Sequence, residues 1–228
     1  MRKIGRAIVM ADLDNLPNDI SKDDFVGNAV GAFACGLSDK IDHAWTSLTG
    51  RGVTTCYAIN QIGSEPGSSI KTLTGMLNIE HSSLVRLLDG LERDGLIERR
   101  LDPDDRRGKK VHLSNEGEEL LTEMLNARRR ILEPMTGRLD DNEMQTLFNL
   151  LEKMMPAVVI GGDDQHFVCR VCELEMCPQE FCAVNGCYEE FKDEATALGF
   201  RRPVGSRREP IVSPCTQSDH GDKQQNVA

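Results

Sequence analysis

Residues 70–113 read IKTLTGMLNIEHSSLVRLLDGLERDGLIERRLDPDDRRGKKVHL, and this stretch decides the fold. Three apolar residues at helical spacing come first: Ile70, Leu73 and Leu77. Asn78 then marks a turn, and four leucines follow at the spacing of a helix face that packs on a core: Leu84, Leu87, Leu88 and Leu91. Asp94-Gly95 ends this second helix, because glycine readily adopts left-handed backbone. The stretch therefore predicts two short helices joined by a tight turn.

A two-stranded hairpin follows the second helix. Residues 96–101 and 109–113 alternate apolar with polar side chains, which is the period of half-buried strands. The segment DPDDRRG at 102–108 has proline and glycine near its two ends, so the strands fold back on each other. The hairpin carries six cations: Arg99, Arg100, Arg106, Arg107, Lys109 and Lys110. Only four acids oppose them, Glu98, Asp102, Asp104 and Asp105, so the hairpin is basic in a chain of net charge −10.

Two helices, a turn and a basic hairpin in this order form a winged helix-turn-helix. The main use of this arrangement is to place the second helix in the major groove of duplex DNA with the hairpin beside it. Three residues on the polar face of that helix are therefore expected to read the major groove: Ser82, Ser83 and Arg86. Two alternatives stay open, that the serines only cap the helix and that the charged hairpin is only a solvated edge.

Three segments together resemble the MarR family of bacterial transcriptional regulators: LLDGLERDGLIER at 87–99, DPDDRR at 102–107 and LSNEG at 113–117. The resemblance extends over roughly residues 25–155 and implies a dimeric repressor or activator that responds to a ligand or to redox state. In this family an Asp-x-Arg element of the wing places its Arg in the minor groove and the Asp orients it. Asp105 and Arg107 occupy these positions, and we expect three neighbouring cations to contact phosphates: Arg106, Lys109 and Lys110.

Apolar helices precede the winged unit. Eight side chains recur at helical intervals in the first: Val26, Val30, Phe33, Leu37, Ile41, Ala44, Trp45 and Leu48. This stripe is long enough to meet a partner helix as well as its own core. A second helix at about residues 54–62 points Cys56 and Ile59 inward, and Gly63 to Gly67 then form a loop.

Two more helices follow the winged unit. Ser114 caps a long helix whose extent Pro134 limits, because proline cannot continue the hydrogen-bond ladder. Asp140 and Glu143 form a capping-box start for the last helix, which Pro156 stops. Both helices carry apolar stripes, and they predict a symmetric partner.

A homodimer is expected, since these flanking stripes would be exposed in a monomer and two-fold DNA sites favour an isologous pair. The stripes could instead pack within one chain. The predicted fold class is mainly α with a small β-hairpin wing: a winged helix-turn-helix with helical dimerisation elements at both ends and a small Cys-rich C-terminal annex. The expected divisions are an N-terminal arm at 1–24, a DNA-binding and dimerisation domain at 25–160, the annex at 161–200 and a disordered tail at 201–228.

The composition excludes several classes of protein. An isoelectric point near 5.0 argues against a general nucleic-acid coat, so affinity for double-stranded DNA must be focused on one face. No run approaches the roughly 18 apolar residues of a membrane span, and no signal peptide is recognisable, so we expect a cytoplasmic protein without membrane contact. No nucleophile motif or phosphate-cradling loop points to an enzyme.

Five of the eight cysteines gather near the C-terminus, and the first four are separated by two, four and four residues: Cys169, Cys172, Cys177 and Cys182. Clustered thiols in a reducing compartment bind metal more often than they form disulfides. Four thiolates can surround one zinc ion, the preferred cofactor, or hold a [4Fe-4S] cluster, the alternative. Metal-free thiols, either redox-active or inert, form a third alternative.

The remaining candidate ligands and thiols have weaker signals. Cys187 repeats the four-residue gap and is either an extra ligand or a redox thiol, and His166 is a substitute ligand or an ordinary loop histidine. Cys35 and Cys56 read as small buried hydrophobes, with a peroxide or electrophile sensor as the alternative. Cys215 reads as an exposed thiol in the tail.

Two functional hypotheses follow from these features. The first is a sequence-specific DNA-binding regulator, expected to be a repressor, whose DNA affinity a small-molecule effector, a metal or the redox state modulates through the Cys cluster. The second is a redox or metal-handling protein that uses its winged domain for protein contacts.

Overall fold

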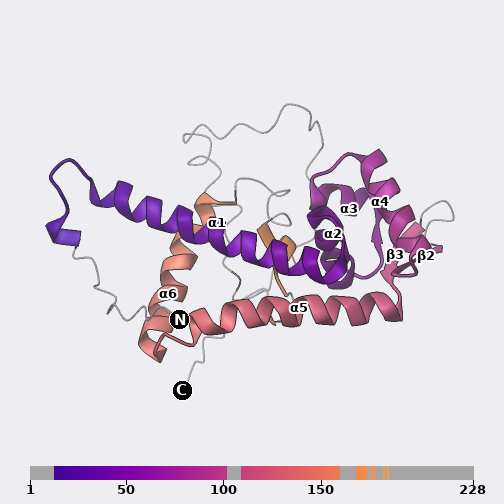
Figure 1. Cartoon of the computed structure of the whole chain (residues 1–228). Coiled ribbons are helices and arrows are strands. Elements are labelled where there is room, and N and C mark those ends of the chain that lie inside the picture. Colours follow the sequence, from indigo (N-terminus) through magenta and orange to yellow (C-terminus); the bar gives the residue numbers. More distant parts are fainter. Residues whose placement is uncertain are drawn as a thin grey trace, which may run out of the picture.

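The computed structural model describes residues 13–101, 109–159, 168–173, 176–177, 182 and 184 of the chain. Two long helices form the stem of the molecule. These helices, α1 (Lys22–Thr49) and α5 (Asn115–Thr136), lie side by side (Figure 1). The fully buried Trp45 of α1 joins them, because its indole N–H donates a 2.7 Å hydrogen bond to the carbonyl of Met124 in α5. A bulky apolar ring and a satisfied donor thus fix the two helices at one point.

The head of the molecule lies at one end of the stem (Figure 1). It consists of α2 (Val53–Ser64), α3 (Ile70–Leu77), α4 (His81–Arg93) and the strands β1 (Ser68–Ser69), β2 (Ile97–Leu101) and β3 (Lys109–Leu113). The strands form one antiparallel sheet in the order β1-β3-β2, and Val111 of β3 pairs with Ser68 on one side and Arg99 on the other. The fold class expected from the sequence, mainly helical with a small wing, is confirmed.

Tight turns connect the elements of the head as the sequence predicts. Asn78 ends α3 with φ of 48°, and Gly95 follows α4 with φ of 74°. Gly117, in the first turn of α5, meets a different requirement. A Cβ atom at this position would lie 2.1 Å from the backbone oxygen of Leu96, so the start of α5 can approach the head this closely only without a side chain.

The core of the head contains the apolar residues that the helical periodicity selects. Seven of them are fully buried or nearly so: Cys56, Ile59, Ile62, Leu73, Leu84, Leu88 and Leu91. They come from α2, α3 and α4, whose apolar faces meet over the sheet residue Val111. Burial of this one contiguous cluster provides the main driving force for folding of the head.

Three helix boundaries differ from the sequence prediction. Helix α1 begins at Lys22, three residues before Phe25, because the Ser21 hydroxyl accepts a hydrogen bond from the backbone N–H of Asp24. Gly63 lies inside α2 rather than in a loop. Pro134 does not end α5, which continues to Thr136, since one missing N–H donor in the last turns is tolerated.

The sheet also departs from the expected pattern at two places. Strand β1 was not expected, because two serines carry no period that distinguishes a strand from a loop. Leu101, placed by alternation on the inner side of β2, is 74% exposed. The end of β2 extends beyond the core, so alternation no longer corresponds to burial there.

Helix α6 (Asp141–Met154) has the predicted start, with Asp140 and Glu143 forming a capping box. Three short 3₁₀ turns complete the described structure: η1 (Leu13–Asn15), η2 (Met155–Ala157) and η3 (Cys169–Val171). Among the described residues, no helix is long and apolar enough to cross a membrane.

Candidate functional site

The outer face of α4 carries the three residues expected to read DNA. Ser82, Ser83 and Arg86 are all exposed. Neither serine caps the helix, because the N-cap residue is Glu80, whose side chain makes no capping hydrogen bond. Arg86 Nε donates to the carbonyl oxygen of Ser82 at 3.3 Å, so its guanidinium folds along its own helix. The face is polar and open to solvent.

The wing presents two of its expected phosphate-binding residues in the described structure. Lys109 is exposed at the start of β3, and Lys110 is half-buried opposite Arg100 of β2. The other expected wing residues, Asp105, Arg106 and Arg107, lie outside the described residues. Strands β2 and β3 therefore place the two lysines beside the connection that carries the Asp-x-Arg element.

Arg99 has a different role from the one that the charge count of the hairpin suggests. Its Nη1 atom lies 2.7 Å from Asp89 Oδ1 and 2.9 Å from Glu92 Oε2, and its side chain is only 12% exposed. Both partners belong to α4, so Arg99 joins the wing to this helix. The charge count therefore overstates the positive charge that the hairpin offers to DNA, because the charge of Arg99 is already balanced by two carboxylates.

The four expected metal ligands lie near one another. Cys169 and Cys172 share the η3 turn, where the Cys172 N–H donates to the Cys169 carbonyl at 2.8 Å. The thiol of Cys169 lies close enough to that of Cys172 to shift its pKa, and the thiol of Cys182 does the same to that of Cys177. Within the described ranges, no three His, Cys, Asp or Glu side chains are placed as a ready-made metal shell. The thiols are thus gathered in two pairs and not closed around a centre.

The first pair contains thiols of contrasting acidity. The hydrogen bond from Cys169 lowers the pKa of Cys172 to about 7, against the effect of burial, and the charges of Arg128 and Arg170 act in the same direction. The same hydrogen bond, burial and the other thiols raise the pKa of Cys169. Burial, the hydrogen bond with Cys182 and nearby thiols raise the pKa of Cys177 to about 11. Cys172 is therefore the most acidic of these three thiols.

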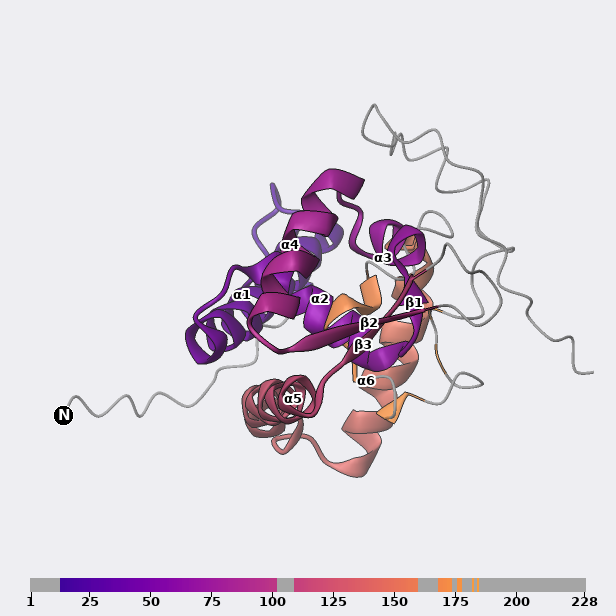
Figure 2. The same cartoon turned by 90° about the vertical axis from the view of Figure 1, so that its right-hand side faces the viewer.

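The segment that carries the first thiol pair packs on α2; we call residues 168–173 the docked loop. Figure 2 shows its η3 turn, in orange, beside α2. Asn60 Nδ2 donates to the carbonyl oxygens of Arg170 and Cys172, each at 3.0 Å, and Gln61 Nε2 donates to that of Cys169 at 3.4 Å. Both amide side chains belong to residues that are 1% exposed. The loop thus supplies acceptors for two buried amides.

Two further contacts hold the docked loop. Arg129 of α5 makes a two-point ion pair with Glu173, in which Nε lies 3.1 Å from Oε2 and Nη2 contacts Oε1. The Arg170 guanidinium lies over the Tyr57 ring, 5.1 Å from its centroid. The loop therefore contacts both α2 and α5. Asn60, Gln61 and Arg129 were not among the functional residues predicted from the sequence, although two adjacent amides inside an apolar helix were a detectable signal.

The two other described cysteines, Cys35 and Cys56, differ in their exposure to solvent. Cys56 is fully buried, with its sulfur 3.3 Å from Thr49 Oγ1, and burial raises the pKa of its thiol. It fits the small buried hydrophobe expected from the sequence. Cys35 is exposed, so that interpretation is wrong for Cys35. Cys187, Cys215 and His166 lie outside the described residues.

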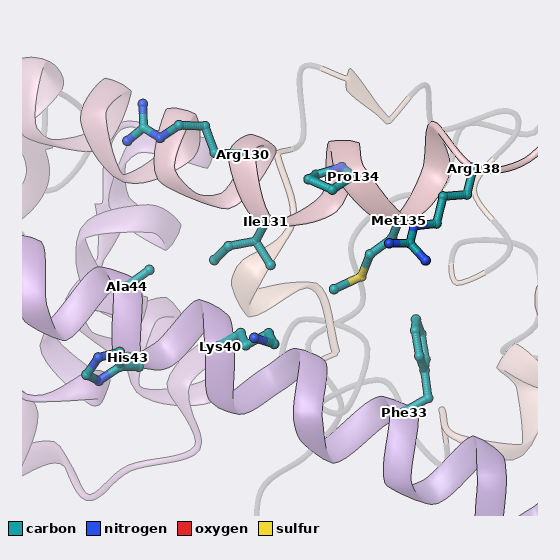
Figure 3. Close-up of a pocket in the computed structure, with 9 residues that line it drawn as sticks. All are labelled: Phe33, Lys40, His43, Ala44, Arg130, Ile131, Pro134, Met135 and Arg138. Carbon is teal, nitrogen blue, oxygen red and sulfur yellow. The ribbon is translucent and has the colours of Figure 1, made fainter. Parts of the chain in front are cut away.

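An open cleft of about 730 Å³ separates α1 from α5 (Figure 3). Four of its side chains carry basic groups: Lys40, His43, Arg130 and Arg138. The other five are apolar: Phe33, Ala44, Ile131, Pro134 and Met135. Basic groups around an apolar floor suit a small anion with an apolar body.

Comparison with known proteins agrees with this geometry. The sequence model of the MarR family matches residues 49–108, which extend from the end of α1 through α2, α3, α4 and β2. A putative transcriptional regulatory protein for the hcr operon of Thauera aromatica is 34% identical over 113 residues, which span 49% of this chain and 68% of that protein.

Solved structures show the same fold. RV1404 from Mycobacterium tuberculosis is 18% identical with a TM-score of 0.53, and the match covers 58% of this chain and 91% of the RV1404 chain. Streptococcus pneumoniae FabT, solved in complex with DNA, is 18% identical with a TM-score of 0.50, and the match covers 57% of this chain and 94% of the FabT chain. The fold defines a winged helix-turn-helix protein. The chain belongs to the MarR family of transcriptional regulators, as the resemblance of its sequence indicates.

Proposed function

We propose that this regulator binds specific double-stranded DNA in the cytoplasm as a homodimer and acts as a repressor. The observation that carries the proposal is the exposed polar face of α4 beside a wing of basic residues. Ser82, Ser83 and Arg86 are assigned to base edges in the major groove. That the fold neighbour FabT was solved in complex with DNA supports a nucleic-acid partner.

The wing would supply the remaining DNA contacts. Arg107 is assigned to the minor groove, with Asp105 orienting its guanidinium, and three cations are assigned to phosphates: Arg106, Lys109 and Lys110. Arg99 is not assigned to a DNA contact, because Asp89 and Glu92 of α4 already balance its charge. In this assignment Arg99 holds the wing at a fixed place relative to the major-groove helix.

The homodimer is supported by two exposed apolar stripes far from the head. Helix α1 exposes four such side chains: Phe25, Val26, Val30 and Phe33. Helix α6 exposes six: Met144, Leu147, Phe148, Leu150, Leu151 and Met154. Contiguous apolar surface of this kind marks an interaction site, and a second copy of the chain presents the same stripes for an isologous interface.

The cleft between α1 and α5 is the proposed site of a small-molecule effector. Its basic groups would hold a carboxylate or a similar anion, and its apolar floor would hold the rest of the molecule. Because the cleft lies between the helices that form the stem, an effector there could change the distance between the two heads of a dimer.

The thiol cluster is proposed as a metal site, with zinc preferred and a [4Fe-4S] cluster as the alternative. Cys169, Cys172, Cys177 and Cys182 would be the ligands, and Cys187 would be an extra ligand or redox thiol. The donor set fits a soft metal, and the positive charges of Arg128 and Arg170 would offset the negative charge of four thiolates. The metal would support the fold or report metal, oxygen or redox state.

The test uses the full chain, purified without oxygen, and a DNA site selected from a random pool. Anisotropy titrations over a range of salt concentrations should show saturable binding that weakens steeply with salt, because phosphate contacts release counterions. Ser82→Ala and Arg86→Ala should lower the preference for the selected site over random DNA. Equal affinity of the wild type for both DNAs would contradict the proposal and favour a winged domain used for protein contacts.

A further inference from the structure

The amides of Asn60 and Gln61 connect two parts of the molecule that the proposed function assigns to different tasks. On one side they bond to the turn between Cys169 and Cys172, which would hold metal. On the other side, the same helix turn carries Ile59 and Ile62, which are fully buried in the core of the head. One turn of α2 therefore contacts both the thiol loop and the DNA-binding core.

The amides depend on the docked loop for their hydrogen bonds. All three of their acceptors are carbonyl oxygens of residues 169–172. A buried amide without a partner is unfavourable, so departure of the loop must be followed by entry of water or by movement of α2. The observed position of α2, in which both amides are buried and hydrogen-bonded, therefore requires that the loop is docked.

Movement of α2 cannot remain local. Helix α2 packs on α3 and on β3, and α3 leads through the Asn78 turn directly into α4. Close-packed interiors transmit displacements, because side chains that interdigitate cannot shift singly. A change at the amide face of α2 is thus passed to both the helix and the wing that we assign to DNA.

Metal binding by the thiol cluster would favour the docked position of the loop. A metal ion bound to Cys169 and Cys172 would hold closed the turn whose carbonyls the amides bind. Glu173, immediately after this turn, is buried against Arg129 of α5, so the loop bridges α2 and the stem. A closed turn presents its three acceptors in one arrangement, whereas an open turn does not.

We propose that metal occupancy of the thiol cluster controls DNA affinity through this contact, with Asn60 and Gln61 transmitting the state of the loop to the head. The inference rests on the proposed function, both for the metal and for DNA. The loaded, docked chain binds DNA tightly and the stripped chain binds it weakly. Linkage requires that DNA strengthens metal binding by the same factor.

The test compares the zinc-loaded and chelator-stripped forms of three full-length proteins. The wild type should lose at least tenfold in affinity for its selected DNA site on stripping. The double variant Asn60→Leu with Gln61→Met keeps side-chain size but removes both donors. It should retain its zinc and bind DNA with the stripped affinity in both forms, with less than a twofold change. Gln145→Met, at an exposed position of α6, should behave as the wild type.

The outcomes separate this inference from the function on which it rests. Absence of site-specific DNA binding by loaded wild type would contradict the proposed function. DNA binding with the same affinity in the loaded and stripped wild type would overturn the inference alone, as would a wild-type response in the double variant. Circular dichroism provides a further check, since global unfolding of the stripped wild type would make the metal structural and would also overturn it.

Discussion

Arg99 of β2 lies 2.7 Å from Asp89 of α4, and this ion pair fixes the wing relative to the helix proposed to enter DNA. The guanidinium is mostly buried and also bonds Glu92, whereas both carboxylates remain partly in solvent. Arg100, the next residue along β2, makes an ion pair with Glu98 in which both side chains are well exposed. Adjacent arginines of one strand thus have different energetic roles.

The first prediction concerns these two arginines. Arg99→Ala should lower the free energy of unfolding by about 1–2 kcal/mol, since two charge-assisted hydrogen bonds and packed side-chain carbons are lost. Arg100→Ala should cost less than about 0.5 kcal/mol, because an exposed pair contributes little. Urea denaturation of the DNA-free proteins measures both, and equal effects would contradict the assigned role of Arg99.

The contrast between these arginines also shows what the sequence could predict. Local periodicity selected the buried leucines of α4 correctly, because i, i+3, i+4 spacing depends only on helix geometry. Alternation along β2 placed Arg99 on the inner side of the strand, but it did not identify the acids of α4 that face it. A charge count treats every arginine of a hairpin alike, and only the packing of helix on strand separates Arg99 from Arg100.

The position of the docked loop could not be predicted from the sequence either, because its contacts join distant parts of the chain. Asn60 and the carbonyl that it binds at Cys172 are 112 residues apart in the sequence. Backbone carbonyls carry no sequence signal, so no pattern of side chains could pair them with the amides. Cys169 and Cys172, in contrast, are only three positions apart in the sequence and lie in one turn, because that relation is local. The site of docking depends on the whole tertiary fold.

The second prediction tests the close approach of α5 to the head. Gly117→Ala should destabilise the chain by about 1–3 kcal/mol, because the new methyl group would overlap the backbone oxygen of Leu96. Gly90→Ala is the matched control: a Cβ there meets nothing within 4 Å, and alanine favours helix. It should stabilise by about 0.5–1 kcal/mol. Thermal unfolding distinguishes the two signs.

The third prediction concerns the wing. Arg107→Ala should weaken binding to the selected DNA site by about 1–3 kcal/mol if this guanidinium enters the minor groove. Lys22→Ala removes an equal charge at the start of α1, where Lys22 pairs with Asp14, and should leave DNA affinity nearly unchanged. Anisotropy titration at fixed salt measures both variants. Equal losses would indicate a general charge effect rather than a contact of Arg107.

The fourth prediction tests the dimer. Phe148→Glu places a charge in the exposed apolar stripe of α6 and should weaken dimerisation at least tenfold, about 1.4 kcal/mol, because that charge would be buried in the interface. Glu152→Gln changes a neighbouring polar residue of the same helix and should leave the dimer intact. Sedimentation velocity over a range of concentrations gives the association state. A wild-type dimer from the Phe148 variant would exclude this stripe from the interface.

The fifth prediction concerns thiol reactivity in reduced protein stripped of metal. The thiolate is the reactive form, and the pKa of Cys172 is about 7, so its alkylation rate should rise steeply as the pH passes through about 7. Cys56 should react far more slowly throughout this range, since burial both shields its sulfur and raises its pKa. Mass spectrometry after timed labelling gives the rate at each residue.

Zinc adds a second arm to this experiment. Saturating zinc should suppress alkylation of Cys172 at every pH tested, because coordination withdraws negative charge from the thiolate and lowers its nucleophilicity, while labelling of the exposed Cys35 should not change. Protection of both residues would indicate a global change in the chain, and protection of neither would remove Cys172 from the metal site. Labelling therefore identifies a ligand by its chemistry in a protein whose fold is monitored by Cys35 and Cys56.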